Sequence, residues 1–96
     1  MSLVHSYVMT ARPGSEDALA EALGRLAAAV EGIAGSRGAM VLRDRKEPAR
    51  FQFLEFWDTP ESRGAAGPQL PKDVMGAIMG ALGGPLQMVD YDRLAG

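Results

Sequence analysis

The sequence predicts a single α+β domain over residues 1–96, built on a four-stranded antiparallel sheet. Two observations support this class. Stretches rich in strand-forming residues are interleaved with stretches in which apolar residues recur every three or four positions. Apolar residues make up 47% of the chain, which is typical of a globular protein. Ninety-six residues are too few for two domains of ordinary size.

The first strand and the first helix are predicted from the opening third of the chain. Leu3–Thr10 alternates in polarity and contains several strand formers. After the turn signal at Pro13-Gly14, Ser15 is expected to cap a helix that ends near Gly32 and Gly35. The apolar face of this helix is formed by Leu19, Leu23, Leu26, Val30 and Ile33.

Two further strands are predicted in the middle of the chain. Residues 39–43 form a short strand, and the charged residues 44–48 form an exposed hairpin connection. Arg50–Trp57 is the clearest strand. Large apolar side chains fall on both of its faces, so both faces are expected to be covered. These side chains are Phe51, Phe53, Leu54, Phe56 and Trp57.

The last third predicts two helices and a final strand. Thr59-Pro60-Glu61 is a typical helix start, and Gly64 and Gly67 keep that helix short. A second helix follows Leu70-Pro71 and ends before 83–85, and residues 86–93 form the last strand. The predicted apolar face of this second helix consists of Met75, Ile78, Met79 and Leu82.

The predicted order is strand, helix, strand, strand, helix, helix, strand. This is the split β-α-β arrangement of a ferredoxin-like fold, in which helices cover only one face of the sheet. The apolar residues on the other face of Arg50–Trp57 therefore need a second cover. A homodimer in which two sheets face each other meets this need symmetrically, so we expect a dimeric α+β barrel.

Composition excludes several classes of function. The net charge of −2 provides no basic patch for nucleic acid. The chain has no cysteine and one histidine, which argues against thiolate, iron–sulfur and multi-histidine metal sites, so we expect no metal and no cofactor. No apolar run approaches the roughly 18 residues of a membrane span, and no signal peptide is visible, so we expect a cytoplasmic protein without membrane contact.

His5 and Tyr7 share one face of the first predicted strand. A lone histidine is more often a hydrogen-bonded residue of the sheet than a catalytic one. Histidine is nevertheless the side chain whose ordinary pKa suits proton transfer near neutrality, so His5 beside Tyr7 is a candidate base for a phenol.

Glu55 and Trp57 share one face of the strand Arg50–Trp57. Trp57 packs in the core or forms a pocket wall whose indole N–H orients a polar ligand atom. Glu55 forms a salt bridge with Arg43 or Arg50, or it acts as a general base of raised pKa.

Met75, Met79 and Phe53 are the candidate ligand-binding residues. The two methionines fill the core or form an adaptable wall of a pocket between helix and sheet. Phe53 belongs to the strand that also carries Glu55 and Trp57.

Two segments resemble the antibiotic-biosynthesis-monooxygenase family. Arg12-Pro13-Gly14 before a long helix resembles the family's entry to its first helix, and residues 53–62 (FLEFWDTPES) resemble its most recognisable segment. The resemblance extends over residues 4–93. It implies a dimeric α+β barrel, and characterised members include cofactor-independent oxygenases of aromatic polyketides, quinol oxygenases and haem-degrading enzymes.

The chain departs from the family pattern nine and ten residues after Trp57. Family members often carry a histidine there, and in the haem-degrading branch it ligates iron; this sequence has Ala66 and Gly67. Haem degradation is therefore disfavoured. The resulting hypothesis is a cofactor-independent monooxygenase of a small aromatic, polyketide-like phenol or quinol, with His5 as base and Trp57 as donor. The alternative is a non-catalytic or regulatory dimer that binds a small ligand.

Overall fold

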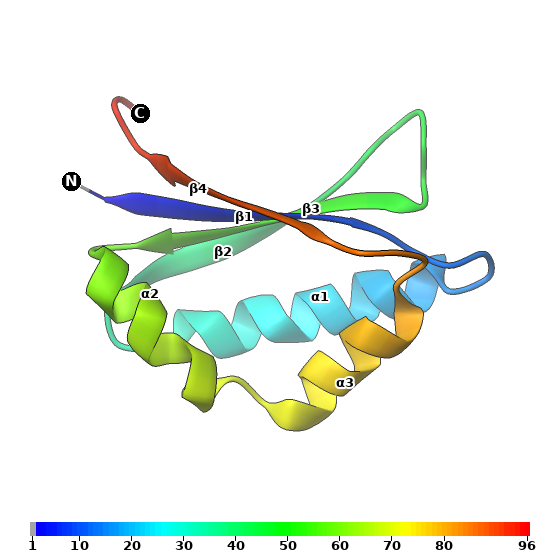
Figure 1. The fold of residues 1–96 in the computed structure, drawn as a ribbon, viewed down its shortest axis with the longest axis horizontal. Coiled ribbons are helices and arrows are strands. Elements are labelled where there is room, and N and C mark those ends of the chain that lie inside the picture. The colour runs from blue at the N-terminus through cyan, green and yellow to red at the C-terminus, as the bar shows by residue number, and fades with distance from the viewer. Residues whose placement is uncertain (1) are drawn as a thin grey trace.

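The computed structural model describes residues 2–96. The elements follow the predicted order, with one short 3-10 helix, η1, between the second and third helices (Figure 1). They are β1 (Leu3–Thr10), α1 (Glu16–Glu31), β2 (Ser36–Arg43), β3 (Arg50–Trp57), α2 (Pro60–Ala66), η1 (Gly67–Gln69), α3 (Lys72–Ala81) and β4 (Gln87–Asp92).

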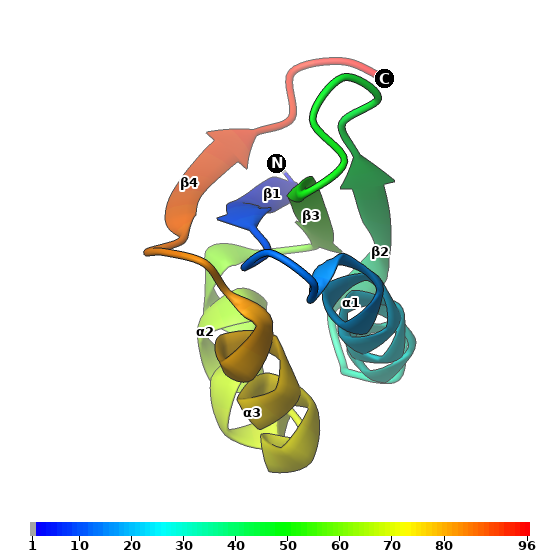
Figure 2. The same cartoon turned by 90° about the vertical axis from the view of Figure 1, so that its right-hand side faces the viewer.

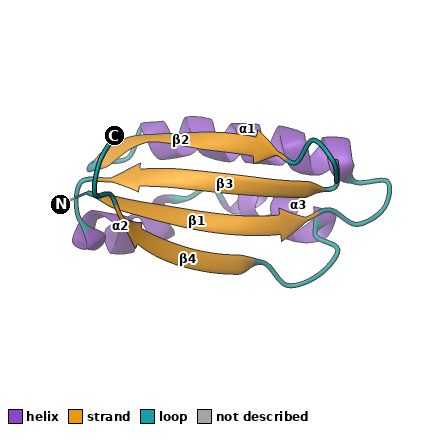
Figure 3. Ribbon diagram, turned by 90° about the horizontal axis from the view of Figure 1, so that it is seen from above, coloured by secondary structure: helices purple, strands orange, loops and turns teal. Residues whose placement is uncertain are grey.

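The four strands form one antiparallel sheet in the order β2-β3-β1-β4, which confirms the ferredoxin-like fold. All helices lie on one face of this sheet, as the view along the sheet and the view from above both show (Figures 2 and 3). We call this the helix face and the other the open face. α1 lies under β2 and β3, whereas α2 and α3 lie toward the β1 and β4 side (Figure 2).

The predicted strands differ from the observed ones mainly at β2, which begins at Ser36 rather than Ala39. The pairing of β2 with β3 is irregular between these two residues, where Gly38 adopts a φ of +105°. Pairing with the regular strand β3 therefore extends β2 through a segment that lacks strand-forming residues. β1 and β3 have the predicted bounds, and β4 lies within the predicted range.

Helix α1 supplies most of the core from the helical layer. Its buried residues are Leu19, Ala22, Leu23, Leu26 and Val30. Ser15 precedes the helix as predicted, but the prediction that its side chain caps the helix is wrong. Its backbone carbonyl accepts the N–H of Leu19 at 2.9 Å instead. Ile33 is buried just beyond the helix end rather than within it.

The start of α2 is as predicted: Thr59 Oγ1 accepts the backbone N–H of Ser62 at 3.1 Å, and Pro60 occupies the first turn. The predicted apolar face of α3 is wrong for Met79, which is 59% exposed. The buried residues of this helix are Val74, Ile78 and Ala81. These follow the spacing of four and three on one helical face, and a residue one position beyond Ile78 points about 100° away from it.

The core lies between the sheet and the helices, around Phe51, Phe53 and Trp57 of β3. On the open face, Leu54 and Phe56 are only half-buried. Several large apolar side chains of this face are exposed in the single chain, namely Met40, Leu42, Val89 and Tyr91. The predicted covering of β3 is therefore confirmed on the helix face, and the covering of the open face by a second copy stays a prediction.

A backbone connection joins the end of β1 to the end of α3. The N–H of Gly83 donates to the carbonyl of Thr10 at 2.7 Å, and the N–H of Arg12 donates to that of Ala81 at 2.9 Å. A Cβ atom at Gly83 would lie 3.0 Å from the Arg12 nitrogen, so glycine permits this close approach.

Within residues 2–96, none of the helices has the length and apolar character that crossing a membrane requires.

Candidate functional site

Three polar residues form a row across the centre of the helix face. In the antiparallel register, His5 of β1 lies directly opposite Glu55 of β3 on one side and Asp90 of β4 on the other. Directly opposed residues project to the same face of a sheet. His5 and Glu55 are each 3% exposed, whereas the Asp90 side chain is 58% exposed. The row therefore runs from the buried interior to the open edge of the molecule.

The hydrogen bonds of His5 define its protonation state. Its Nδ1 pairs with Asp90 Oδ1, and its Nε2 lies 2.7 Å from a terminal nitrogen of Arg63. A guanidinium group only donates, so Nε2 accepts this bond and the ring proton lies on Nδ1, which donates to the carboxylate. The histidine is thus a neutral base that is oriented by an acid behind it, and its lone pair is covered by a cation.

Arg63 comes from α2, the short helix that follows β3 directly. The same terminal nitrogen also donates to the hydroxyl of Tyr7 at 3.3 Å. Its Nε is buried and has no hydrogen-bond partner in the described part of the chain. The guanidinium therefore binds two neutral acceptors and no carboxylate.

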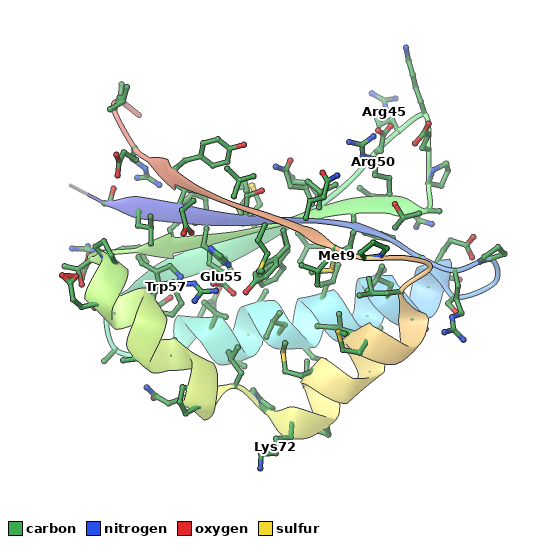
Figure 4. The ribbon with its side chains drawn as sticks, in the orientation of Figure 1. Met9, Arg45, Arg50, Glu55, Trp57 and Lys72 are labelled. Atoms are coloured by element: carbon green, nitrogen blue, oxygen red, sulfur yellow. The ribbon has the colours of Figure 1, made fainter. Side chains whose placement is uncertain are left out.

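Glu55 and Trp57 form a pair along β3 and project into the layer between sheet and helices (Figure 4). The indole N–H of Trp57 donates to Glu55 Oε1 at 3.1 Å. Burial raises the pKa of Glu55 above its usual value, and the hydrogen bond from Trp57 together with the positive charge of Arg63 opposes this effect.

The predicted salt bridge from Glu55 to Arg43 or Arg50 is wrong. Arg50 lies at the far end of the sheet from Glu55 (Figure 4). Arg43 donates to the carbonyl of Pro48 at 2.6 Å and stacks over the ring of Phe51. Strand position alone does not show which charged residues share one end of a sheet.

Tyr7 packs edge-on against the imidazole of His5, with ring centroids 4.5 Å apart and planes at 88°. Burial raises the pKa of Tyr7, and the negative charge of Glu55 adds to this effect, while Arg63 opposes it. The phenol therefore stays protonated at neutral pH. Because it accepts from Arg63, its own O–H remains available to a ligand.

A small cavity of about 30 Å³ adjoins these residues. It is lined by Tyr7, Glu55, Trp57, Arg63, Ala66, Gly67 and Leu70. This is room for about one water molecule, whereas a cavity that holds benzene measures about 150 Å³. A larger hollow of about 470 Å³ lies beside the β2–β3 hairpin and includes Arg43 and Arg50. It is an open surface groove remote from His5, so we assign the site to the smaller cavity.

The structure brings together the four candidate catalytic residues, namely His5, Tyr7, Glu55 and Trp57. Phe53 lies beside them, with its ring centroid 6.2 Å from that of Tyr7. Met75 is partly buried against the core, and Met79 is exposed; neither lines the cavity. Their predicted role in ligand binding has no support from position and stays a prediction.

Sequence reasoning missed Arg63 and Asp90. Arg63 had a usable signal, because it is the one basic residue between Thr59 and Pro71, in a helix expected to follow the strand that carries Glu55. Asp90 had none, because its contact with His5 depends on the register between the first and last strands.

The site offers little to a metal or haem. Within residues 2–96, no three histidine, aspartate or glutamate side chains are grouped so as to hold a metal ion. Ala66 and Gly67, which stand where the family often has a histidine, line the cavity without supplying a ligand. Both ring nitrogens of His5 are engaged by Asp90 and Arg63. The residues present therefore do not fit a haem group.

The fold and the site define a class of protein: a ferredoxin-like α+β domain with a buried acid–base cluster between sheet and helices. The chain belongs to the antibiotic biosynthesis monooxygenase family, whose sequence model matches residues 2–65. This confirms the resemblance given by Arg12-Pro13-Gly14 and residues 53–62. No curated protein sequence matches the chain.

Solved structures share the fold over nearly the whole chain. A protein from Chloroflexus aurantiacus that is named for the same family is 25% identical, with a TM-score of 0.82, covering 100% of this chain and 96% of that one. PA3566 from Pseudomonas aeruginosa is 23% identical, with a TM-score of 0.82 and coverage of 98% and 95%. A point variant of SnoaB, a cofactor-independent oxygenase from Streptomyces nogalater, is 14% identical, with a TM-score of 0.83 and coverage of 99% and 95%.

Proposed function

We propose that this protein is a cofactor-independent monooxygenase that acts on a small aromatic, polyketide-like phenol or quinol. The observation that carries the proposal is the neutral imidazole of His5, which Asp90 orients through Nδ1 and whose Nε2 accepts a hydrogen bond from Arg63, a residue that lines the cavity. Membership of the monooxygenase family and the structural likeness to SnoaB support an oxygenase of this general kind.

The reaction needs a base and little else from the protein. His5 Nε2 removes the proton of the substrate hydroxyl, and the Asp90 carboxylate stabilises the imidazolium that forms. The electron-rich substrate anion then reduces dioxygen itself. For a CH₂ group activated in this way, one oxygen atom becomes the product carbonyl, and the other leaves as water with the two hydrogens of that carbon.

The neighbouring residues orient the substrate in this proposal. The hydroxyl of Tyr7 donates to the substrate oxygen, and the Trp57 ring forms a wall. The Trp57 N–H reaches a ligand only when Glu55 releases it, because Glu55 Oε1 accepts this N–H in the structure. Phe53, beside Tyr7, extends the apolar wall.

We also propose that the active form is a homodimer joined through the open face. This face exposes Met40, Leu42, Val89 and Tyr91 in a single chain, and such a patch favours a protein partner. Sedimentation at micromolar concentration should give about twice the chain mass of 10.2 kDa. A mass of one chain that does not change with concentration would contradict the dimer.

A second candidate is a non-catalytic dimer that binds a small ligand for regulation. The size of the cavity favours it, because about 30 Å³ does not admit an aromatic ring without movement of the α2–η1 segment. In that case, ligands would bind and no oxygen would be consumed.

The deciding experiment is oxygen uptake with a panel of hydroquinones and anthrones. We expect one dioxygen consumed per anthrone oxidised, at a rate above that of the uncatalysed reaction and of the His5→Ala variant at equal concentration. Ligand binding without oxygen uptake across the panel would favour the regulatory alternative.

A further inference from the structure

Arg63 makes no direct ion pair, although its charge lies near enough to Glu55 to lower the pKa of that carboxyl. Within residues 2–96, the ion pairs join His5 to Asp90, Arg25 to Asp73 and Arg37 to Asp58, and none includes Arg63. Its Nε is buried without an acceptor. Buried polar atoms in proteins are ordinarily hydrogen-bonded, so the buried Nε leaves this half-buried guanidinium with a free donor that suits an anionic ligand.

The partners that Arg63 does have are the groups a phenolic substrate would need. One terminal nitrogen covers the lone pair of His5 Nε2 at 2.7 Å and contacts the hydroxyl of Tyr7 at 3.3 Å. A base whose lone pair accepts a bond from a cation cannot take a proton until that cation moves. A substrate hydroxyl must therefore replace Arg63 at Nε2.

Resting on the function proposed above, we infer that Arg63 is a catalytic residue that exchanges places with the substrate hydroxyl and then binds the oxyanion. The substrate class is accordingly a phenol or enol that is held as its anion. The proton passes from the substrate oxygen to His5 Nε2, no other bond changes in this step, and Arg63 keeps its charge. The oxyanion then lies between the new imidazolium and the guanidinium.

The surroundings of Arg63 permit this exchange. Ala66 is the one buried residue of α2, and η1 has none, so few contacts hold the segment in place. Gly64 follows Arg63 in the helix, and Gly67 begins η1; interior glycine weakens a helix. Opening of this segment would also enlarge the cavity, which Arg63, Ala66, Gly67 and Leu70 line on the helical side.

Two carboxyl groups, those of Asp90 and Glu55, lie near the position proposed for the substrate anion. Asp90 holds the far side of His5 and stabilises the imidazolium. Glu55, which also lines the cavity, accepts the indole N–H of Trp57, and burial raises the pKa of its carboxyl, which reduces the negative charge that a bound anion meets. A substrate anion therefore meets Arg63, the imidazolium and the Tyr7 hydroxyl.

The test uses para-nitrophenol, a phenol that dioxygen does not oxidise and whose anion has a visible absorption band. It is titrated into the full chain without a histidine tag, at a pH where half of the free phenol is ionised. We expect the bound phenol to be largely ionised. Because His5 is the only histidine of the chain, its ring ¹⁵N signals report the proton transfer directly. They should change from one protonated nitrogen, Nδ1, to two.

Arg63→Gln should weaken phenolate binding by roughly tenfold or more, since it removes a charge-assisted hydrogen bond to the anion. Arg63→Lys keeps the positive charge but lacks the planar set of N–H donors of a guanidinium, so it should restore part of the affinity. Arg25→Gln is the matched control, because it removes the same charge from an exposed ion pair with Asp73 and should leave binding unchanged. If Arg63→Gln does not fold, Arg63→Lys carries the test, with an expected loss of at least threefold.

Three results would overturn the inference: the wild type does not bind para-nitrophenol, it binds the neutral phenol with His5 still singly protonated, or the Arg63 variants bind the anion as well as the wild type does. Oxygen uptake separates this failure from that of the proposed function. Uptake with no role for Arg63 rejects the inference alone, and Arg63-dependent phenolate binding without uptake by any anthrone rejects the oxygenase alone.

Discussion

The helix face of the sheet has two halves that are packed in different ways. Under β2 and β3, α1 buries five apolar residues, including Leu19, Leu23 and Leu26. Toward β1 and β4, α3 buries three residues, whereas the α2–η1 segment buries Ala66 alone and covers His5, Tyr7 and Glu55. The two halves share one sheet, so the same strands support a dry core on one side and a polar site on the other.

This difference separates the part of the domain that stabilises the fold from the part that contains the candidate site. Apolar burial under α1 supplies the free energy of folding. The half beside α2 contains buried polar groups, which cost free energy unless they are paired. Under the proposed function, the weakly packed cover over that half would let a ligand enter, and the following predictions test this difference between the halves.

The largest effect should come from a cavity in the α1 half. Leu23→Ala removes a fully buried side chain and should lower the free energy of unfolding by about 3 kcal/mol. Leu70→Ala, at a partly buried position beside η1, should cost less than half as much. Urea denaturation of both variants measures this, and equal losses would mean that the halves are equally packed.

If the proposed function holds, His5→Ala should lower kcat by roughly 10²-fold or more, the usual scale of general-base catalysis, and leave the fold and the proposed dimer intact. Asp90→Asn keeps the shape of the acceptor and loses its charge, so we expect about a tenfold loss. Steady-state oxygen uptake gives both values. Turnover that is unchanged in His5→Ala would return this histidine to a purely structural role.

The buried carboxyl of Glu55 should make the site half sensitive to pH. Its pKa is raised in the folded state above the usual 4.5, so the folded protein binds more protons than the unfolded chain does in this window. Its contribution to stability is therefore present below that value and lost as pH rises through the folded pKa. The free energy of unfolding of the wild type, relative to Glu55→Gln, should therefore fall as pH rises above the usual carboxyl pKa of 4.5 and level off once the carboxyl is ionised in the folded protein.

The control for this prediction is Glu21→Gln, at an exposed position of α1. Its stability difference from the wild type should show no such fall. Parallel pH profiles for the wild type and Glu55→Gln would show that the carboxyl is not perturbed by burial.

The smallest effect compares two glycines with open space around them. Gly24 lies in α1 and Gly64 in α2, and an added Cβ would meet no atom within 4 Å at either position. Each change to alanine should stabilise its helix by up to about 1 kcal/mol. If α2 must open for turnover, Gly64→Ala should slow it by up to about fivefold, whereas Gly24→Ala should not change it.

Thermal melting and oxygen uptake on the same samples decide this comparison. Equal turnover in the two glycine variants would show that α2 does not limit the reaction.

The sequence predicts one half of the molecule much better than the other. The spacing of Leu19, Leu23 and Leu26 determines the α1 face, and the aromatic strand Arg50–Trp57 has its predicted bounds. Short segments rich in glycine carry weak periodicity, so the face of α3 was mispredicted at Met79.

The site was predicted in part for a related reason. Side chains that alternate along one strand, such as His5 with Tyr7 and Glu55 with Trp57, could be placed on a common face from the sequence. Asp90 reaches His5 through the pairing of β4 with β1, and Arg63 reaches it because α2 folds back over the sheet. Both contacts are tertiary, and no local sequence pattern encodes them.

The backbone connection between Thr10 and Gly83 has a consequence for changing substrate scope. It fixes the chain just after α3, and the hydrogen bond from Asp58 to the carbonyl of Gly35, 2.8 Å long, fixes it just before α2. The segment between these two fixed points lines the helical side of the cavity, so its length determines how deep the cavity is. Insertions or deletions in its glycine- and proline-rich residues 64–71 would resize the cavity while the sheet, with its row of acid and base, keeps its register.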